Sequence, residues 1–105
     1  MGRMPFEIDP LRERIVESCR RYHVRRLDLF GSSVREDFDS ERSDVDFLVE
    51  FSDTSPDGAA DRYFGLRDSL QAVVGRPVDL VVRSAVRNPY FLQAIAREQR
   101  NIYAA

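Results

Sequence analysis

The sequence contains no lysine, since all 16 of its basic residues are arginines. No lysine amine is therefore available as a nucleophile or as the acceptor of a transferred group. The single cysteine, Cys19, excludes an intramolecular disulfide. The single histidine, His23, has no ligand partner at a suitable spacing, and neither has Cys19, so the sequence does not favour a zinc site.

Long apolar runs and a strong excess of one charge are also missing. No stretch approaches 18 apolar residues, and the first fourteen residues, MGRMPFEIDPLRER, lack the apolar segment of a secretory signal. The net charge is -2, with no basic tail, so we expect no direct binding to duplex nucleic acid. We expect a cytoplasmic protein with no membrane partner, folded as a single domain over residues 1–105.

Apolar periodicity predicts helices that alternate with short strands. In chain order we expect a helix from Pro10 to about His23, strands at 26–30 and 44–51, a helix at 60–74, a strand at 78–82, and a last helix beginning at Pro89. The apolar face of the 60–74 helix should comprise Ala60, Tyr63, Leu66, Leu70, Val73 and Val74, and that of the last helix Phe91, Leu92, Ile95, Ile102 and Tyr103. This order indicates the α/β (α+β) class, with helices flanking a small β-sheet.

Acidic residues stand at the start of two of these strands. Asp44 and Asp46 alternate with Val45, so both carboxylates should point to one face of the strand, with Cα atoms roughly 6.5 Å apart. Two carboxylates this close repel each other, and a divalent cation is the usual compensation. If the 78–82 strand pairs beside the 44–51 strand, Asp79 can join them. Such hard oxygen ligands suit Mg²⁺ or Mn²⁺.

A small turn, Gly31-Ser32, precedes these acids in the segment LFGSSVREDFDSERSDVDFLVEF. Residues 33–36, SVRE, fit a capping box, so a short helix could follow the turn and direct its free N–H groups at an anion. Arg35 could bind a phosphate or form a surface salt bridge. Ser43 could hydrogen-bond a phosphate or cap the turn.

A metal site beside a phosphate-binding turn suits nucleotidyl transfer with two metal ions. We therefore take Asp44, Asp46 and Asp79 as candidate catalytic residues and metal ligands, and Gly31, Ser32, Arg35 and Ser43 as candidate nucleotide-binding residues. Each feature alone has a simpler explanation, because Asp-x-Asp can be a solvated edge, Gly-Ser an ordinary turn and Asp79 a charge that blocks edge pairing. The combination and its strand context favour the site.

Together, LFGSSVRE, SDVDFLVEF and PVDLVV resemble the minimal nucleotidyltransferases of the DNA polymerase β superfamily. That pattern is Gly-Ser, a spacer of about ten residues, Asp-x-Asp and a later strand Asp. The resemblance covers nearly the whole chain and implies a small mixed sheet flanked by helices. It also implies that Asp44, Asp46 and Asp79 bind two Mg²⁺ ions, and that Gly31 and Ser32 hold the phosphates of ATP.

The resemblance further implies a partner. Such proteins are commonly antitoxins that move AMP from ATP to a tyrosine of a cognate HEPN ribonuclease toxin, in a hetero-oligomer. The family often has Arg-Ala-Arg-Gly after Gly-Ser, where this chain has Ser33-Val34-Arg35-Glu36. Two alternatives therefore stay open: an antitoxin that neutralises its toxin by binding alone, and nucleotidyl transfer to a small molecule or an RNA end.

Overall fold

The computed structural model describes residues 8–31 and 44–105. Along this part of the chain lie η1 (Asp9–Leu11), α1 (Arg12–Arg21), β1 (Val24–Phe30), β2 (Val45–Phe51), α2 (Ala59–Val74), β3 (Val78–Val82), η3 (Arg83–Ala85), α3 (Pro89–Arg97) and β4 (Arg100–Ala104). The strands form one sheet in the order β3-β2-β1-β4. Because β2 pairs with β3 in parallel while β1 pairs antiparallel with β2 and β4, the sheet is mixed. The expected α+β class is confirmed.

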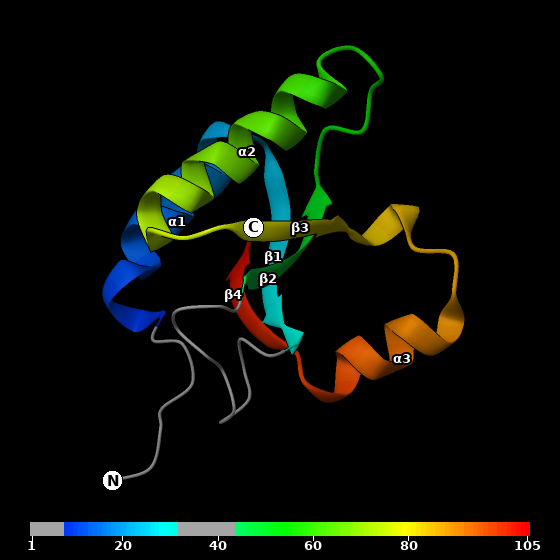
Figure 1. Ribbon diagram of the computed structural model, residues 1–105. Helices are drawn as coiled ribbons and strands as arrows, with labels where there is room; N and C mark the ends of the chain where they lie inside the picture. The colour runs from blue at the N-terminus through cyan, green and yellow to red at the C-terminus, as the bar shows by residue number, and fades with distance from the viewer. Residues whose placement is uncertain (1–7, 32–43) are drawn as a thin grey trace, which may run out of the picture.

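Helices α1 and α2 pack together on one face of the sheet, and α3 lies apart from them beside the end of β1 (Figure 1). Strand alternation explains this division, because successive side chains of β1 and β2 enter different clusters. Leu27, Leu29, Phe47 and Val49 belong to the main core under α1 and α2. A smaller cluster on the other face joins Phe30 and Leu48 to Ile95 of α3.

A glycine allows α1 and α2 to approach closely. At Gly65, within α2, a Cβ atom would overlap the ring of Tyr22, whose Cζ atom would be only 2.9 Å away. Glycine lowers helix propensity, but here it leaves room for an aromatic ring from the end of α1. The predicted apolar face of α2 is confirmed at Leu66, Leu70 and Val74, which are buried. The prediction for Ala60 is wrong, since Ala60 is exposed at the start of the helix.

The predicted last helix is too long. It begins at Pro89 as expected, where the side chain of Asn88 accepts a hydrogen bond from the Tyr90 amide, but it ends at Arg97. The chain then forms β4, whose Ile102 is buried in the main core, whereas Ile95 packs in the cluster on the opposite face of the sheet. One straight helical stripe cannot reach both faces. Pairing with β1 therefore overrides the apparent periodicity.

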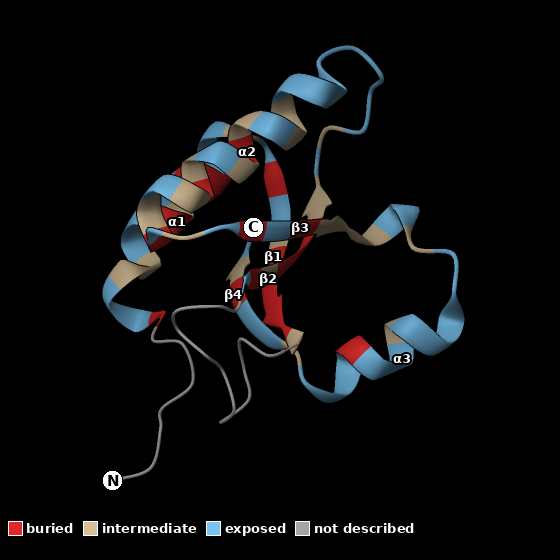
Figure 2. Cartoon of the chain, viewed as in Figure 1, coloured by how far each residue is buried: buried red, intermediate tan, exposed pale blue. Residues whose placement is uncertain are grey.

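Burial follows the same two-sided plan. Buried positions form stripes on α1 and α2, whereas α3 presents mostly exposed surface (Figure 2). No helix in the described part of the chain has the length and apolar character needed to cross a membrane.

Candidate active site

The predicted acids lie at one end of the strands of the sheet. Strand β1 ends at Phe30. The antiparallel β2 and its parallel neighbour β3 both begin at that same end of the sheet. Phe30 is the register partner of Asp46, and Asp46 is the register partner of Asp79. A row Phe30–Asp46–Asp79 therefore crosses three strands, with adjacent strands about 4.8 Å apart.

The acids face away from the main core. Asp46 lies between Val45 and Phe47, both fully buried under α1 and α2, so its own side chain belongs to the α3 face. Asp46 is half-buried, while Asp79 and Asp44 are exposed. Asp44 precedes β2 by one residue, and strand alternation places it on the side of Asp46. The 78–82 strand does pair beside the 44–51 strand, which was the condition for Asp79 to join Asp44 and Asp46.

The turn after β1 meets this row directly. Gly31 has φ +65°, in the left-handed region that favours glycine. A Cβ atom at Gly31 would lie 2.5 Å from Oδ2 of Asp46 and 3.4 Å from its Cγ. Glycine is therefore needed twice, for the backbone conformation and for the space that the Asp46 carboxylate fills.

The donor chemistry of this edge suits magnesium in one respect. Mg²⁺ is usually bound by one or two carboxylates, with waters and substrate phosphates as the other ligands, and the paired Asp46 and Asp79 offer such a set. Within residues 8–31 and 44–105, however, no group of three or more His, Cys, Asp or Glu side chains is close enough to hold a metal ion. The three aspartates lie at the same end of the strands, but their side chains are not clustered closely enough to form a complete metal site.

Ser32, Arg35 and Ser43 lie outside the described residues, as does the capping box at 33–36. Of the four predicted phosphate contacts, Gly31 is the one that the structure describes, and it lies against Asp46.

Sequence reasoning missed a buried acid on the same face. Asp28 is 1% exposed and accepts hydrogen bonds from Arg26 Nε at 2.9 Å, Gln99 Nε2 at 3.0 Å and Asn101 Nδ2 at 2.9 Å. It thereby ties the connection between α3 and β4 to the middle of the sheet. The periodicity signal for Asp28 was its place opposite Leu27 and Leu29, but its partners follow only from the pairing of β4.

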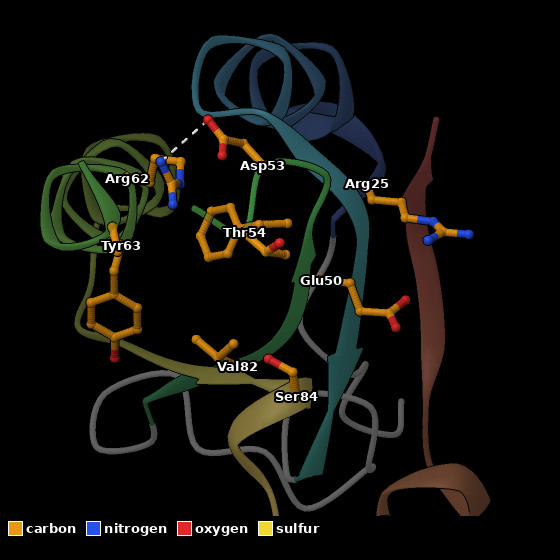
Figure 3. Close-up of a pocket in the computed structure, with 10 residues that line it drawn as sticks. Arg25, Glu50, Asp53, Thr54, Arg62, Tyr63, Val82 and Ser84 are labelled. Atoms are coloured by element: carbon orange, nitrogen blue, oxygen red, sulfur yellow. Dashed lines mark ion pairs between the residues drawn. The ribbon is translucent and has the colours of Figure 1, made fainter. Parts of the chain in front are cut away.

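A separate hollow of about 400 Å³ lies at the other end of β2 and β3, against the start of α2. Arg62 and Tyr63 of α2 border it together with Val82 of β3 (Figure 3). Two of its polar side chains have partners: Arg62 pairs with Asp53 at 3.3 Å, and the Tyr63 hydroxyl donates to the Leu80 carbonyl at 2.7 Å. Of the predicted site residues, the four that the structure describes (Gly31, Asp44, Asp46 and Asp79) do not line this hollow.

The pKa of Asp53 is lowered from its ordinary value. The main causes are hydrogen bonds from the Ser55 side chain and backbone, and the charge of Arg62 contributes as well. Arg62 also donates to the carbonyls of Asp57 and Ser55. These contacts organise the loop before α2.

A family model and a named relative each match most of this chain. The family model described as "Nucleotidyltransferase domain" matches residues 12–102. MJ0128 of Methanocaldococcus jannaschii, provisionally named a protein adenylyltransferase, is 40% identical over 78 residues, which are 74% of this chain and 76% of the relative.

Solved structures share the fold. A structure provisionally described as a minimal nucleotidyltransferase superposes with a TM-score of 0.72 at 27% identity, covering 88% of this chain and 89% of the other. The complex of a tri-AMPylated Shewanella oneidensis HEPN toxin with its MNT antitoxin gives 0.65 at 19% identity, covering 94% of this chain and 74% of that one. The chain therefore belongs to the nucleotidyltransferase domain family and is a nucleotidyltransferase of the minimal, polymerase-β-like kind.

Proposed function

We propose that this nucleotidyltransferase moves AMP from ATP to a tyrosine hydroxyl of a HEPN-type toxin, and that it acts as the antitoxin in a hetero-oligomer with that partner. Two findings support the proposal. The 40% identical relative carries the name of a protein adenylyltransferase. The fold is shared with an MNT antitoxin whose toxin partner is tri-AMPylated.

The row Phe30–Asp46–Asp79 carries the proposal, because Asp46 lies against Gly31 and is the register partner of Asp79. Asp44, Asp46 and Asp79 would hold the Mg²⁺ ions, with substrate phosphates completing the ligand set. Bound Mg²⁺ would neutralise phosphate charge and acidify the acceptor hydroxyl. Gly31, together with Ser32, Arg35 and Ser43, would contact the phosphates.

The bond changes are those of a nucleotidyl transfer. The acceptor oxygen forms a bond to the α-phosphorus of ATP while the bond from that phosphorus to the bridging oxygen breaks. Pyrophosphate leaves with the electron pair of the broken bond, and the proton of the acceptor hydroxyl passes to solvent water. The chain's own contribution would be to hold the triphosphate at the turn after β1 and to present the carboxylates of Asp44, Asp46 and Asp79 on the α3 face of the sheet.

The experiment is label transfer from [α-³²P]ATP, with Mg²⁺, to a HEPN partner encoded beside this chain. We expect one or more AMP groups on the wild-type partner and none when its candidate tyrosine is replaced by Phe. The Asp44→Asn/Asp46→Asn variant should transfer no label, while the Asp61→Asn/Asp68→Asn variant, changed at exposed α2 acids, serves as the matched control.

Toxin neutralisation in cells distinguishes the proposed AMP transfer from neutralisation by binding alone. Neutralisation by the Asp44→Asn/Asp46→Asn variant as complete as that by wild type, with no label on the toxin, would contradict the proposal. Label found on a small hydroxylated compound or an RNA end, and not on the toxin, would replace the proposed acceptor and leave nucleotidyl transfer standing.

A further inference from the structure

An aromatic side chain of α3 stays partly open to solvent beside the acid row. Phe91 is 42% exposed, although it packs against Phe30 with ring centroids 6.5 Å apart and planes at 86°. Phe30 itself is buried. Phe30 is the register partner of Asp46, so Phe91 contacts the residue that lies beside Asp46 in the sheet.

The position of Phe91 differs from that of the other exposed aromatic side chains. Phe64 projects from α2, on the far face of the sheet, and the guanidinium of Arg67 lies over its ring at 5.0 Å from the centroid. Tyr90 is 78% exposed at the start of α3 but has no ring contact with Phe30 among those described. Phe91 thus combines an anchored ring with open apolar surface next to the acids.

Packing alone does not require this exposure. Ile95 of α3 is 4% exposed and fills the small cluster with Phe30 and Leu48, so the helix is already anchored one turn beyond Phe91. A nucleoside triphosphate has charged phosphates at one end and a flat apolar base at the other. The acid row and the Gly31 turn match the first part, and a half-exposed ring beside them matches the second.

We infer that Phe91 is the stacking surface for the nucleobase of the triphosphate substrate, and so a positioning residue for the proposed AMP transfer. The inference rests on the proposed function. Stacking sets where the base lies while the phosphates lie at the acid row, and the ring accepts any base because every base has a π-face. The base itself does not need to contact Asp46 or Asp79.

The absence of tryptophan from the chain permits a direct test. In Phe91→Trp the new indole is the sole tryptophan, and a stacked adenine quenches its fluorescence. With Mg²⁺ present, we expect saturable quenching by ATP and none by tripolyphosphate. Phe64→Trp, on the opposite face, is the matched control and should respond to neither ligand.

Phe91→Leu keeps apolar packing on Phe30 and removes the aromatic face. We expect this substitution to weaken ATP binding, measured by calorimetry, roughly 5- to 100-fold and to leave tripolyphosphate binding unchanged. It should raise KM for ATP with little change in kcat. Phe91→Tyr should restore ATP affinity, which a merely structural role for the ring would not predict so selectively.

The outcomes separate the inference from the function on which it rests. Wild-type protein that transfers AMP, with unchanged ATP affinity in Phe91→Leu, overturns the inference alone. So does a Phe91→Leu variant whose only defect is a raised KM for the toxin, which would assign the ring to the partner. Wild-type protein that neither binds ATP nor transfers AMP overturns both.

Discussion

The carboxylate of Asp46 occupies the space into which a side chain on Gly31 would project, since a Cβ atom there would lie 2.5 Å from Oδ2. The backbone at Gly31 has φ +65°, so any other residue would also be strained. This contact joins the turn after β1 to the acid row of β2 and β3. Several consequences can be measured.

Gly31→Ala should lower the rate of AMP transfer by more than its loss of unfolding free energy explains. Gly75 provides the matched control, because it has φ +73° but open space around the position of a Cβ atom. Both substitutions should cost about 1–2 kcal/mol of unfolding free energy from the left-handed backbone, measured by urea denaturation. Only Gly31→Ala should displace Asp46 and lower AMP transfer. Equal activity of the two variants would show that the contact does not matter for the site.

Asp28 should be a main determinant of how α3 and β4 are fixed to the sheet. Replacing the buried carboxylate by an amide in Asp28→Asn weakens charge-assisted bonds from Arg26, Gln99 and Asn101. We expect a loss of about 2–3 kcal/mol in unfolding free energy. The control Asp68→Asn, at an exposed ion pair with Arg67, should change stability by less than about 0.5 kcal/mol. Similar losses in both variants would refute the anchoring role.

The buried thiol of Cys19 should make stability depend on alkaline pH. Burial raises the pKa of Cys19 to about 12, whereas an unfolded thiol ionises near about 8.5. Below that value both states keep the proton and stability is unaffected; as pH rises through the interval, the unfolded state loses its proton first, so the folded state loses stability. Wild type should have a larger free energy of unfolding than Cys19→Ala at pH 8, and this difference should become smaller by pH 10. A constant gap would mean that the thiol is not shielded.

Local patterns predicted the elements that position the acids. Leu27 and Leu29 alternate with Asp28 and Phe30, and this two-residue period correctly gave the two faces of β1. Asp79 can join Asp46 only if their two strands pair, and the parallel pairing of β2 with β3 meets this condition. These features depend on neighbouring residues or on the short distance between consecutive strands.

Features that depend on distant pairing were not predictable. Ile102 was assigned to the last helix because its spacing from Ile95 fits a helical face, yet hydrogen bonding of β4 to β1 draws it into the main core. The burial of Asp28 has the same origin, since its partners Gln99 and Asn101 come from the chain's end. The requirement for glycine at position 65 has the same origin, because the ring of Tyr22 that occupies the space beside it is remote in sequence.

The central claim is that the edge formed by Asp44, Asp46 and Asp79 carries the nucleotidyl transfer. Asp79 gives the most direct test, because its side chain is exposed and its replacement should leave the fold intact. We expect Asp79→Asn to lower the rate of AMP transfer about 100-fold or more, with an unchanged unfolding midpoint, while the exposed control Asp61→Asn keeps the wild-type rate. Transfer by Asp79→Asn within twofold of wild type would contradict the account.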